Sequence, residues 1–132
     1  MRVLYIDDDR INALLFSEAC RFAGGVDVQT ADTGSEALEI ATEWRPDLLV
    51  IDLHLPDMLG YALLPRLRGQ LAAPELPAFL CTADHASEVA EPARRAGFDG
   101  CWAKPVELQV VLSELARRSV QARGRDAGLS PA

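Results

Sequence analysis

Polar side chains of the kind that handle metal ions and phosphate follow several short apolar runs in this sequence. They are Asp7 and Asp8, Asp52, Thr82 and Lys104, which come after the runs at residues 3–6, 48–51, 78–81 and 100–103. If these runs are parallel strands of one sheet, their carboxyl ends share an edge, which is where open α/β sheets build their sites. The sequence therefore predicts that carboxylates, a hydroxyl and an amine gather in one place.

Such a cluster suits a divalent cation and a phosphoryl group. Carboxylate oxygens are the ligands that Mg²⁺ prefers, usually together with retained waters. Carboxylates about 5 Å apart repel by about 3 kcal/mol per pair at an effective dielectric constant of about 20, and a bound cation and Lys104 would relieve that repulsion. One carboxylate could attack phosphorus and form an aspartyl phosphate, while Lys104 offsets the phosphoryl charge and Thr82 donates its hydroxyl.

Length, charge and cysteine content restrict the class of protein. A chain of 132 residues with 49% hydrophobic composition fits one domain. The 20 acidic and 13 basic residues give a formal charge of −7, which argues against direct binding of nucleic acid. Three cysteines without a paired spacing predict neither a disulfide framework nor a zinc site. With neither a signal peptide nor a run of membrane-spanning length, we expect a soluble, cytoplasmic protein.

Apolar runs of strand length alternate with helical patterns, which predicts repeated βαβ units and a mainly parallel sheet. We expect five strands, at about residues 3–6, 26–31, 48–52, 78–81 and 100–103. We expect five helices, at about residues 12–22, 33–44, 60–68, 87–96 and 106–118. Pro65 and Pro92 fall inside two of these helices and imply a kink or a late start. Residues 1–120 would form the domain and residues 121–132 a flexible tail or linker.

The order and surroundings of these residues resemble the receiver domain of two-component response regulators. Asp7 and Asp8 are similar to the acidic pair that follows the first strand of that family. Asp52 begins an aspartate-x-x-x-proline-x-x-x-glycine pattern like that of the phosphoacceptor. Thr82 resembles the switch threonine, and Lys104, followed by proline, resembles the lysine of the lysine-proline pair. The resemblance covers about residues 2 to 118.

The resemblance implies a flavodoxin-like, doubly wound α/β fold in which a five-stranded parallel sheet has the order 2-1-3-4-5 and is accompanied by five helices. It also implies that Asp8, Asp52 and the backbone carbonyl of His54 coordinate Mg²⁺, with Asp7 contributing mainly through water. Asp52 would accept the phosphoryl group. Lys104 would bridge to that group, and Thr82 would engage it.

The function implied is that of a phosphoacceptor in a two-component phosphorelay. The phosphoryl group would come from a phosphohistidine on a sensor histidine kinase or a histidine phosphotransfer protein, and would be relayed by conformational change or onward transfer. Catalysis would be limited to self-phosphorylation and slow autodephosphorylation. A homodimer through the face of the fourth helix, fifth strand and fifth helix is compatible with this function. A stand-alone regulator, a fragment of a larger regulator and the receiver of a hybrid kinase all stay open.

Two other functions stay open at this stage. A phosphorylation-independent interaction scaffold would explain why Cys101 stands where the family usually has tyrosine or phenylalanine. We interpret Cys101 as a small buried filler and expect Trp102 on the opposite face of the strand. A Mg²⁺-dependent phosphohydrolase would need an Asp-x-Asp nucleophile loop, and Asp7 and Asp9 have that spacing, but a cap domain and the usual hydroxyl motif do not appear.

Several polar residues near the cluster have simpler roles. We expect Asp9 to cap the first helix and Asp57 to shape the loop after the third strand. His54 would be solvated, would border the phosphoryl group and would influence its hydrolysis. Asp84 would flank the same opening.

Overall fold

The computed structural model describes residues 1–84, 86–104, 106–107, 109–114 and 116–117. The strands are β1 (Arg2–Ile6), β2 (Asp27–Ala31), β3 (Leu48–Asp52), β4 (Ala78–Thr82) and β5 (Gly100–Ala103). The helices are α1 (Arg10–Ala23), α2 (Gly34–Ile40), α3 (Gly60–Gln70) and α4 (Ala86–Arg95). Residues 109–114 and 116–117 are also helical and correspond to the expected fifth helix. The tail expected at residues 121–132 lies outside the described residues.

The five strands form one parallel sheet in the order β2-β1-β3-β4-β5, which confirms the expected topology. The chain moves outward from β1 to β2 on one side and from β3 to β5 on the other. The direction of winding therefore reverses between β1 and β3, and the carboxyl ends of strands at such a point are where open α/β sheets bind ligands.

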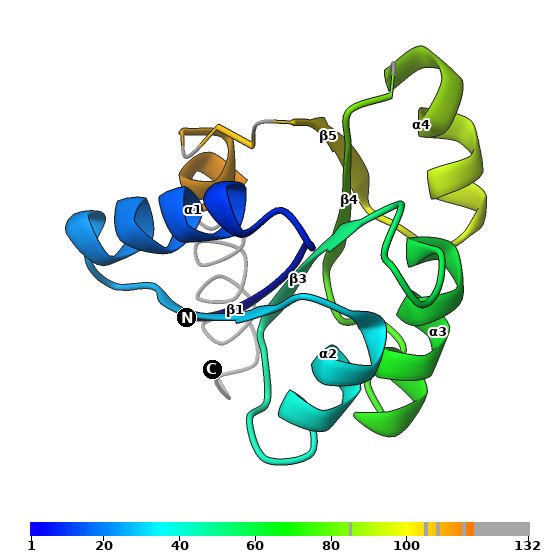
Figure 1. Ribbon diagram of the computed structural model, residues 1–132, viewed down its shortest axis with the longest axis horizontal. Helices are drawn as coiled ribbons and strands as arrows, with labels where there is room; N and C mark the ends of the chain where they lie inside the picture. Colours follow the sequence, from blue (N-terminus) through cyan, green and yellow to red (C-terminus); the bar gives the residue numbers. More distant parts are fainter. Residues whose placement is uncertain (85, 105, 108, 115, 118–132) are drawn as a thin grey trace, which may run out of the picture.

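Helices cover both faces of the sheet (Figure 1). Successive side chains of a strand point to opposite faces, and β1 shows this alternation clearly. Its Leu4 and Ile6 belong to the apolar core beneath α2, α3 and α4. Its Val3 and Tyr5 belong to a second core that includes Phe16 of α1 and residue 111 of the C-terminal helical segment. The central strands β3 and β4 are buried along their whole length, as expected for a sheet covered on both sides.

The second helix is shorter than the sequence pattern predicts. It begins as expected, because the Thr33 hydroxyl accepts a hydrogen bond from the amide of Glu36. It ends at Ile40 rather than near Trp44, because the chain tightens into a turn in which the amide of Thr42 donates to the carbonyl of Glu39. The Thr42 hydroxyl donates to the same carbonyl at 2.7 Å, which offers the backbone an alternative to a further helical turn.

The two helices that contain prolines are continuous across them. Pro65 lies inside α3 and Pro92 lies inside α4, so the late start offered as an alternative for each helix is wrong. Proline removes the hydrogen bond to the carbonyl four residues earlier and crowds that carbonyl, which for Pro65 belongs to the first turn of its helix. Within the described residues, none of the helices has the length and apolar character needed to span a membrane.

Candidate functional site

The polar residues singled out in the sequence lie along the carboxyl edge of the sheet. Asp7 follows β1, Asp52 ends β3 and Thr82 ends β4, while Lys104 follows β5. Backbone hydrogen bonds extend the ladders past the strand ends: the Asp7 amide donates to the carbonyl of Ala31 at 3.0 Å, and the Lys104 amide donates to the carbonyl of Thr82 at 2.9 Å. The sheet itself therefore determines where these side chains start.

Three carboxylates and one ammonium group form the centre of the site. Asp7, Asp8 and Asp52 each offer an oxygen atom, and these atoms all lie within 4.8 Å of one another. Asp7 and Asp52 are buried, whereas Asp8 is exposed at the rim. The Lys104 Nζ lies 3.0 Å from Asp7 Oδ1 and 2.9 Å from Asp52 Oδ2. The ammonium group thus bridges the two buried carboxylates.

The electrostatic state of Asp52 reflects a balance between burial and the lysine. Burial raises the pKa of Asp52, the hydrogen bond and charge of Lys104 lower it, and the charge of Asp7 raises it again, with a net increase above 3.8. For Lys104, burial alone would lower the pKa, but its hydrogen bonds to Asp52 and Asp7 raise it overall. The lysine therefore stays charged, while the environment of Asp52 disfavours its charge.

The mouth of the site holds a pair that sequence reasoning did not predict. The His54 Nε2 lies 3.1 Å from Asp84 Oδ2, so the two residues expected to flank the opening contact each other across it. The His54 amide donates to Asp52 Oδ1 at 3.4 Å, and the Asp84 amide donates to the Thr82 hydroxyl at 3.1 Å. Both side chains remain largely exposed, at 65% and 47%. The backbone of this pair thus contacts Asp52 and Thr82, and its side chains lie beside the site in contact with solvent.

Asp57 fixes the loop between β3 and α3 by capping a different helix. Its carboxylate accepts hydrogen bonds from the amides of Gly34 and Ser35 at 2.9 and 3.0 Å and from the Ser35 hydroxyl at 2.9 Å. Those amide donors lower the pKa of Asp57. Sequence reasoning predicted a loop-shaping role but missed the partner, which lies more than twenty residues earlier. The same loop needs glycine at position 60, where a Cβ would lie 2.6 Å from the carbonyl oxygen of Asp52.

Asp9 caps α1 as expected, because its carboxylate accepts hydrogen bonds from the amides of Ile11 and Asn12. The Asp9 carboxylate is therefore occupied at the helix end.

The structure also places Tyr5 beside the cluster, although the sequence analysis did not predict a role for it. Its hydroxyl donates to Asp7 Oδ2 at 3.3 Å, and the spacing of two residues on one strand was a signal that could have identified it.

The strand that carries Lys104 divides its side chains as expected. Cys101 is half-buried against the core beneath α2, α3 and α4, and burial raises the pKa of its thiol. Trp102 lies on the opposite face and stacks on Phe79, with ring centroids 4.3 Å apart and planes 5° apart. Trp102 therefore does not replace the aromatic side chain that Cys101 lacks.

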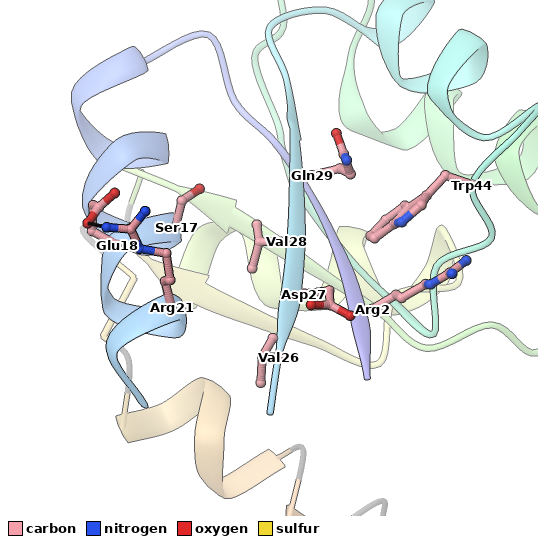
Figure 2. A pocket seen from close by; sticks show the side chains of 9 residues that line it. All are labelled: Arg2, Ser17, Glu18, Arg21, Val26, Asp27, Val28, Gln29 and Trp44. Carbon is pink, nitrogen blue, oxygen red and sulfur yellow. Dashed lines mark ion pairs between the residues drawn. The ribbon is translucent and has the colours of Figure 1, made fainter. Parts of the chain in front are cut away.

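A separate pocket of about 420 Å³ lies at the outer edge of β2, away from the carboxylate cluster. Figure 2 shows that Glu18 and Arg21 of α1 line it on one side of the strand, whereas Arg2 and Trp44 line it on the other. The Arg2 guanidinium lies over the Trp44 ring, 5.5 Å from its centroid. The pocket mixes both signs of charge and contains none of the residues of the cluster.

Comparison with known proteins defines the class to which this fold and site belong. The family model of the response regulator receiver domain matches residues 3–116. The chain belongs to this family and is a receiver domain of the kind found in two-component systems.

Relatives of known name include regulators and hybrid sensor kinases. The chain is 38% identical over 113 residues to the probable transcriptional regulatory protein TcrX of Mycobacterium tuberculosis. This match covers 86% of the present chain and 47% of TcrX. It is 32% identical over 123 residues to the sensor histidine kinase RcsC of Escherichia coli. This match covers 93% of the present chain and 13% of RcsC. The chain thus spans less than half the length of each of these relatives.

Solved structures agree with the family assignment. A CheY-like receiver domain protein from Methanospirillum hungatei superposes with a TM-score of 0.80 at 25% identity, covering 94% of this chain and 97% of that one. A putative response regulator from Chloroflexus aurantiacus gives a TM-score of 0.78 at 31% identity, covering 88% of this chain and 94% of that one. The fold is therefore shared along nearly the whole length of these domains.

Proposed function

We propose that this receiver domain accepts a phosphoryl group on Asp52 from a phosphohistidine of a partner kinase or phosphotransfer protein. The observation that carries the proposal is the position of Asp52. It is a buried carboxylate at the carboxyl end of β3, the strand that pairs with β1, and lies 2.9 Å from an ammonium group and beside two further carboxylates. A nucleophile, a cation and a metal-binding donor set thus lie together.

The donor set fits Mg²⁺. Asp7, Asp8 and Asp52 supply hard oxygen ligands within 4.8 Å of one another, and one of them opens to solvent, where the ion could keep its waters. Asp8, Asp52 and the His54 backbone carbonyl would hold the ion, with Asp7 acting mainly through water. When bound, it would offset the negative charge of the phosphoryl oxygens.

The transfer itself needs few groups. A carboxylate oxygen of Asp52 attacks phosphorus, the new O–P bond forms as the P–N bond to the donor histidine breaks, and the electron pair leaves with the imidazole nitrogen. The Lys104 ammonium, already 2.9 Å from Asp52, moves to a phosphoryl oxygen and offsets its charge. The Thr82 hydroxyl lies at the end of the neighbouring strand, from which it donates to a second phosphoryl oxygen.

The partner would dock around this edge of the sheet. Three large apolar side chains of α1, Ile11, Leu14 and Leu15, are 71%, 61% and 62% exposed in the half of the helix that follows the acidic pair. Exposed apolar side chains at helical spacing mark an interaction surface. A helical surface of the donor protein packed there would bring its phosphohistidine over Asp52.

Stoichiometry distinguishes this function from the phosphohydrolase alternative. With Mg²⁺ and phosphoramidate, a small P–N donor, we expect one phosphoryl group per chain. With a general ester such as para-nitrophenyl phosphate, we expect no multiple turnover. Many ester hydrolyses per chain would instead support the hydrolase. A chain that accepts no phosphoryl group from phosphoramidate or acetyl phosphate would support the scaffold.

The contact between His54 and Asp84 predicts an effect on the lifetime of the phosphorylated state. We expect His54→Ala to shorten that lifetime about two- to tenfold without reducing the final extent of labelling, because removal of the imidazole opens the approach of water to Asp52. The decay of the labelled protein after removal of the donor measures it. Loss of labelling in His54→Ala would contradict the prediction.

A further inference from the structure

We propose that Tyr5 is a positioning residue for the acidic cluster. Its hydroxyl would hold the Asp7 carboxylate in the orientation that the metal and Lys104 require. This inference rests on the Mg²⁺ site of the proposed function. The phenolic hydroxyl donates to Asp7 Oδ2 at 3.3 Å in a fully buried contact. A phenylalanine would fill the same space, so the hydroxyl calls for an explanation other than packing.

The ring of Tyr5 is held firmly enough to fix its hydroxyl. Tyr5 is 1% exposed and lies in the core formed with α1. It stacks on Phe16 with ring centroids 4.6 Å apart and planes 24° apart. Tyr5 and Asp7 are two residues apart in an extended segment, so their side chains project to the same side of the sheet. The hydroxyl of Tyr5 therefore reaches the Asp7 carboxylate from within the buried core. A buried hydroxyl is retained at little cost only when it has such a partner.

The donors around Asp7 divide between its two oxygen atoms. Oδ1 accepts from the Lys104 ammonium at 3.0 Å and from the Asp9 amide at 3.0 Å, whereas Oδ2 accepts from Tyr5. This division locks the rotation of the carboxylate. The lysine is expected to leave Asp7 for the phosphoryl group during transfer. The contact with Tyr5 then remains, because the ring cannot move without disturbing its stack on Phe16.

The test is a titration of the full chain with MgCl₂ by isothermal calorimetry, comparing wild type with Tyr5→Phe. The variant keeps the ring and loses one oxygen atom. We expect its Mg²⁺ dissociation constant to rise about three- to tenfold, which is part of the full effect of losing a hydrogen bond to a charged group, because the hydroxyl contacts Asp7 in the metal-free chain as well. In an Asp7→Asn background, Tyr5→Phe should have less than about half of that effect, since the two residues act as one unit.

A matched control separates positioning from packing. Cys20→Ala removes a fully buried side chain of the same core and leaves both rings of the Tyr5–Phe16 stack in place, so it should lower the unfolding temperature and leave the Mg²⁺ dissociation constant unchanged. Equal Mg²⁺ affinity in wild type and Tyr5→Phe would overturn the role of Tyr5 while leaving the proposed function intact. An equal loss of affinity in Cys20→Ala and Tyr5→Phe would also overturn it. A wild-type chain that binds no Mg²⁺ would overturn both the metal site and this inference.

Discussion

Replacing Lys104 with methionine is expected to slow the phosphorylation of Asp52 by phosphoramidate about 100-fold or more. The ammonium group is 2.9 Å from the attacking carboxylate and is the group that offsets charge on the phosphoryl oxygens. Removing one preorganised donor of this kind typically reduces a rate by a factor of about 100 to 1,000. The initial rate of labelling, followed by intact-protein mass spectrometry at fixed donor and Mg²⁺, measures the effect.

The same substitution should destabilise the metal-free protein by about 3 kcal/mol, because Asp7 and Asp52 would keep their buried charges without the cation that bridges them. Urea denaturation with and without Mg²⁺ tests this, and added Mg²⁺ should recover part of the loss. Lys104→Arg keeps the charge and serves as the matched control, with most of the stability retained. A Lys104→Met variant that is labelled at the wild-type rate would contradict the role given to the lysine.

Asp52→Asn should have the opposite effect on stability and stabilise the metal-free protein at neutral pH by about 1 kcal/mol or more. Burial is the largest cause that disfavours the charge of Asp52, and the charge of Asp7 adds to it, while the hydrogen bond and charge of Lys104 at 2.9 Å act in the opposite direction. The net result is a raised pKa, and an increase by one pKa unit corresponds to about 1.4 kcal/mol of stability lost to the charged form. Urea denaturation in EDTA measures the change.

The gain in stability should depend on pH. The pKa of Asp52 is raised by burial above its ordinary 3.8, so the folded protein binds a proton there more tightly than the unfolded chain does. The destabilisation caused by its charge is therefore fully present above the raised pKa and is relieved as pH falls toward 3.8. The difference between Asp52→Asn and wild type should shrink over that interval. A wild-type chain more stable than the variant at pH 7 in EDTA would contradict the electrostatic account.

The fold and the membership of the cluster follow from a pattern that is local in sequence. Each strand is a short apolar run, and Asp7, Asp52 and Thr82 stand at the ends of such runs. Parallel strands place their ends at one edge, so the topology alone predicts which residues meet. The order of the strands came from the resemblance to receiver domains and not from the local pattern, and that order is confirmed.

The contacts that refine the site depend on loops and side-chain orientation, which no local pattern contains. Asp57 caps a helix that begins more than twenty residues earlier, and His54 meets a residue thirty positions later. Neither spacing has a periodic signature. The early end of α2 at Ile40 was missed because the Thr42 hydroxyl competes for a helical carbonyl, which weakens the helix only in that turn.

The central claim, that Asp52 is the phosphoacceptor, is tested most directly by locating the label. The chain and its Asp52→Asn variant are incubated with acetyl phosphate and Mg²⁺, and intact-protein and peptide mass spectrometry follow. Wild type should gain one phosphoryl group on the peptide that contains Asp52, and the label should be released by hydroxylamine, as expected of an acyl phosphate. The variant, which retains Asp7, Asp8 and Lys104, should gain none. Labelling of the Asp52→Asn variant to the wild-type extent would contradict the account.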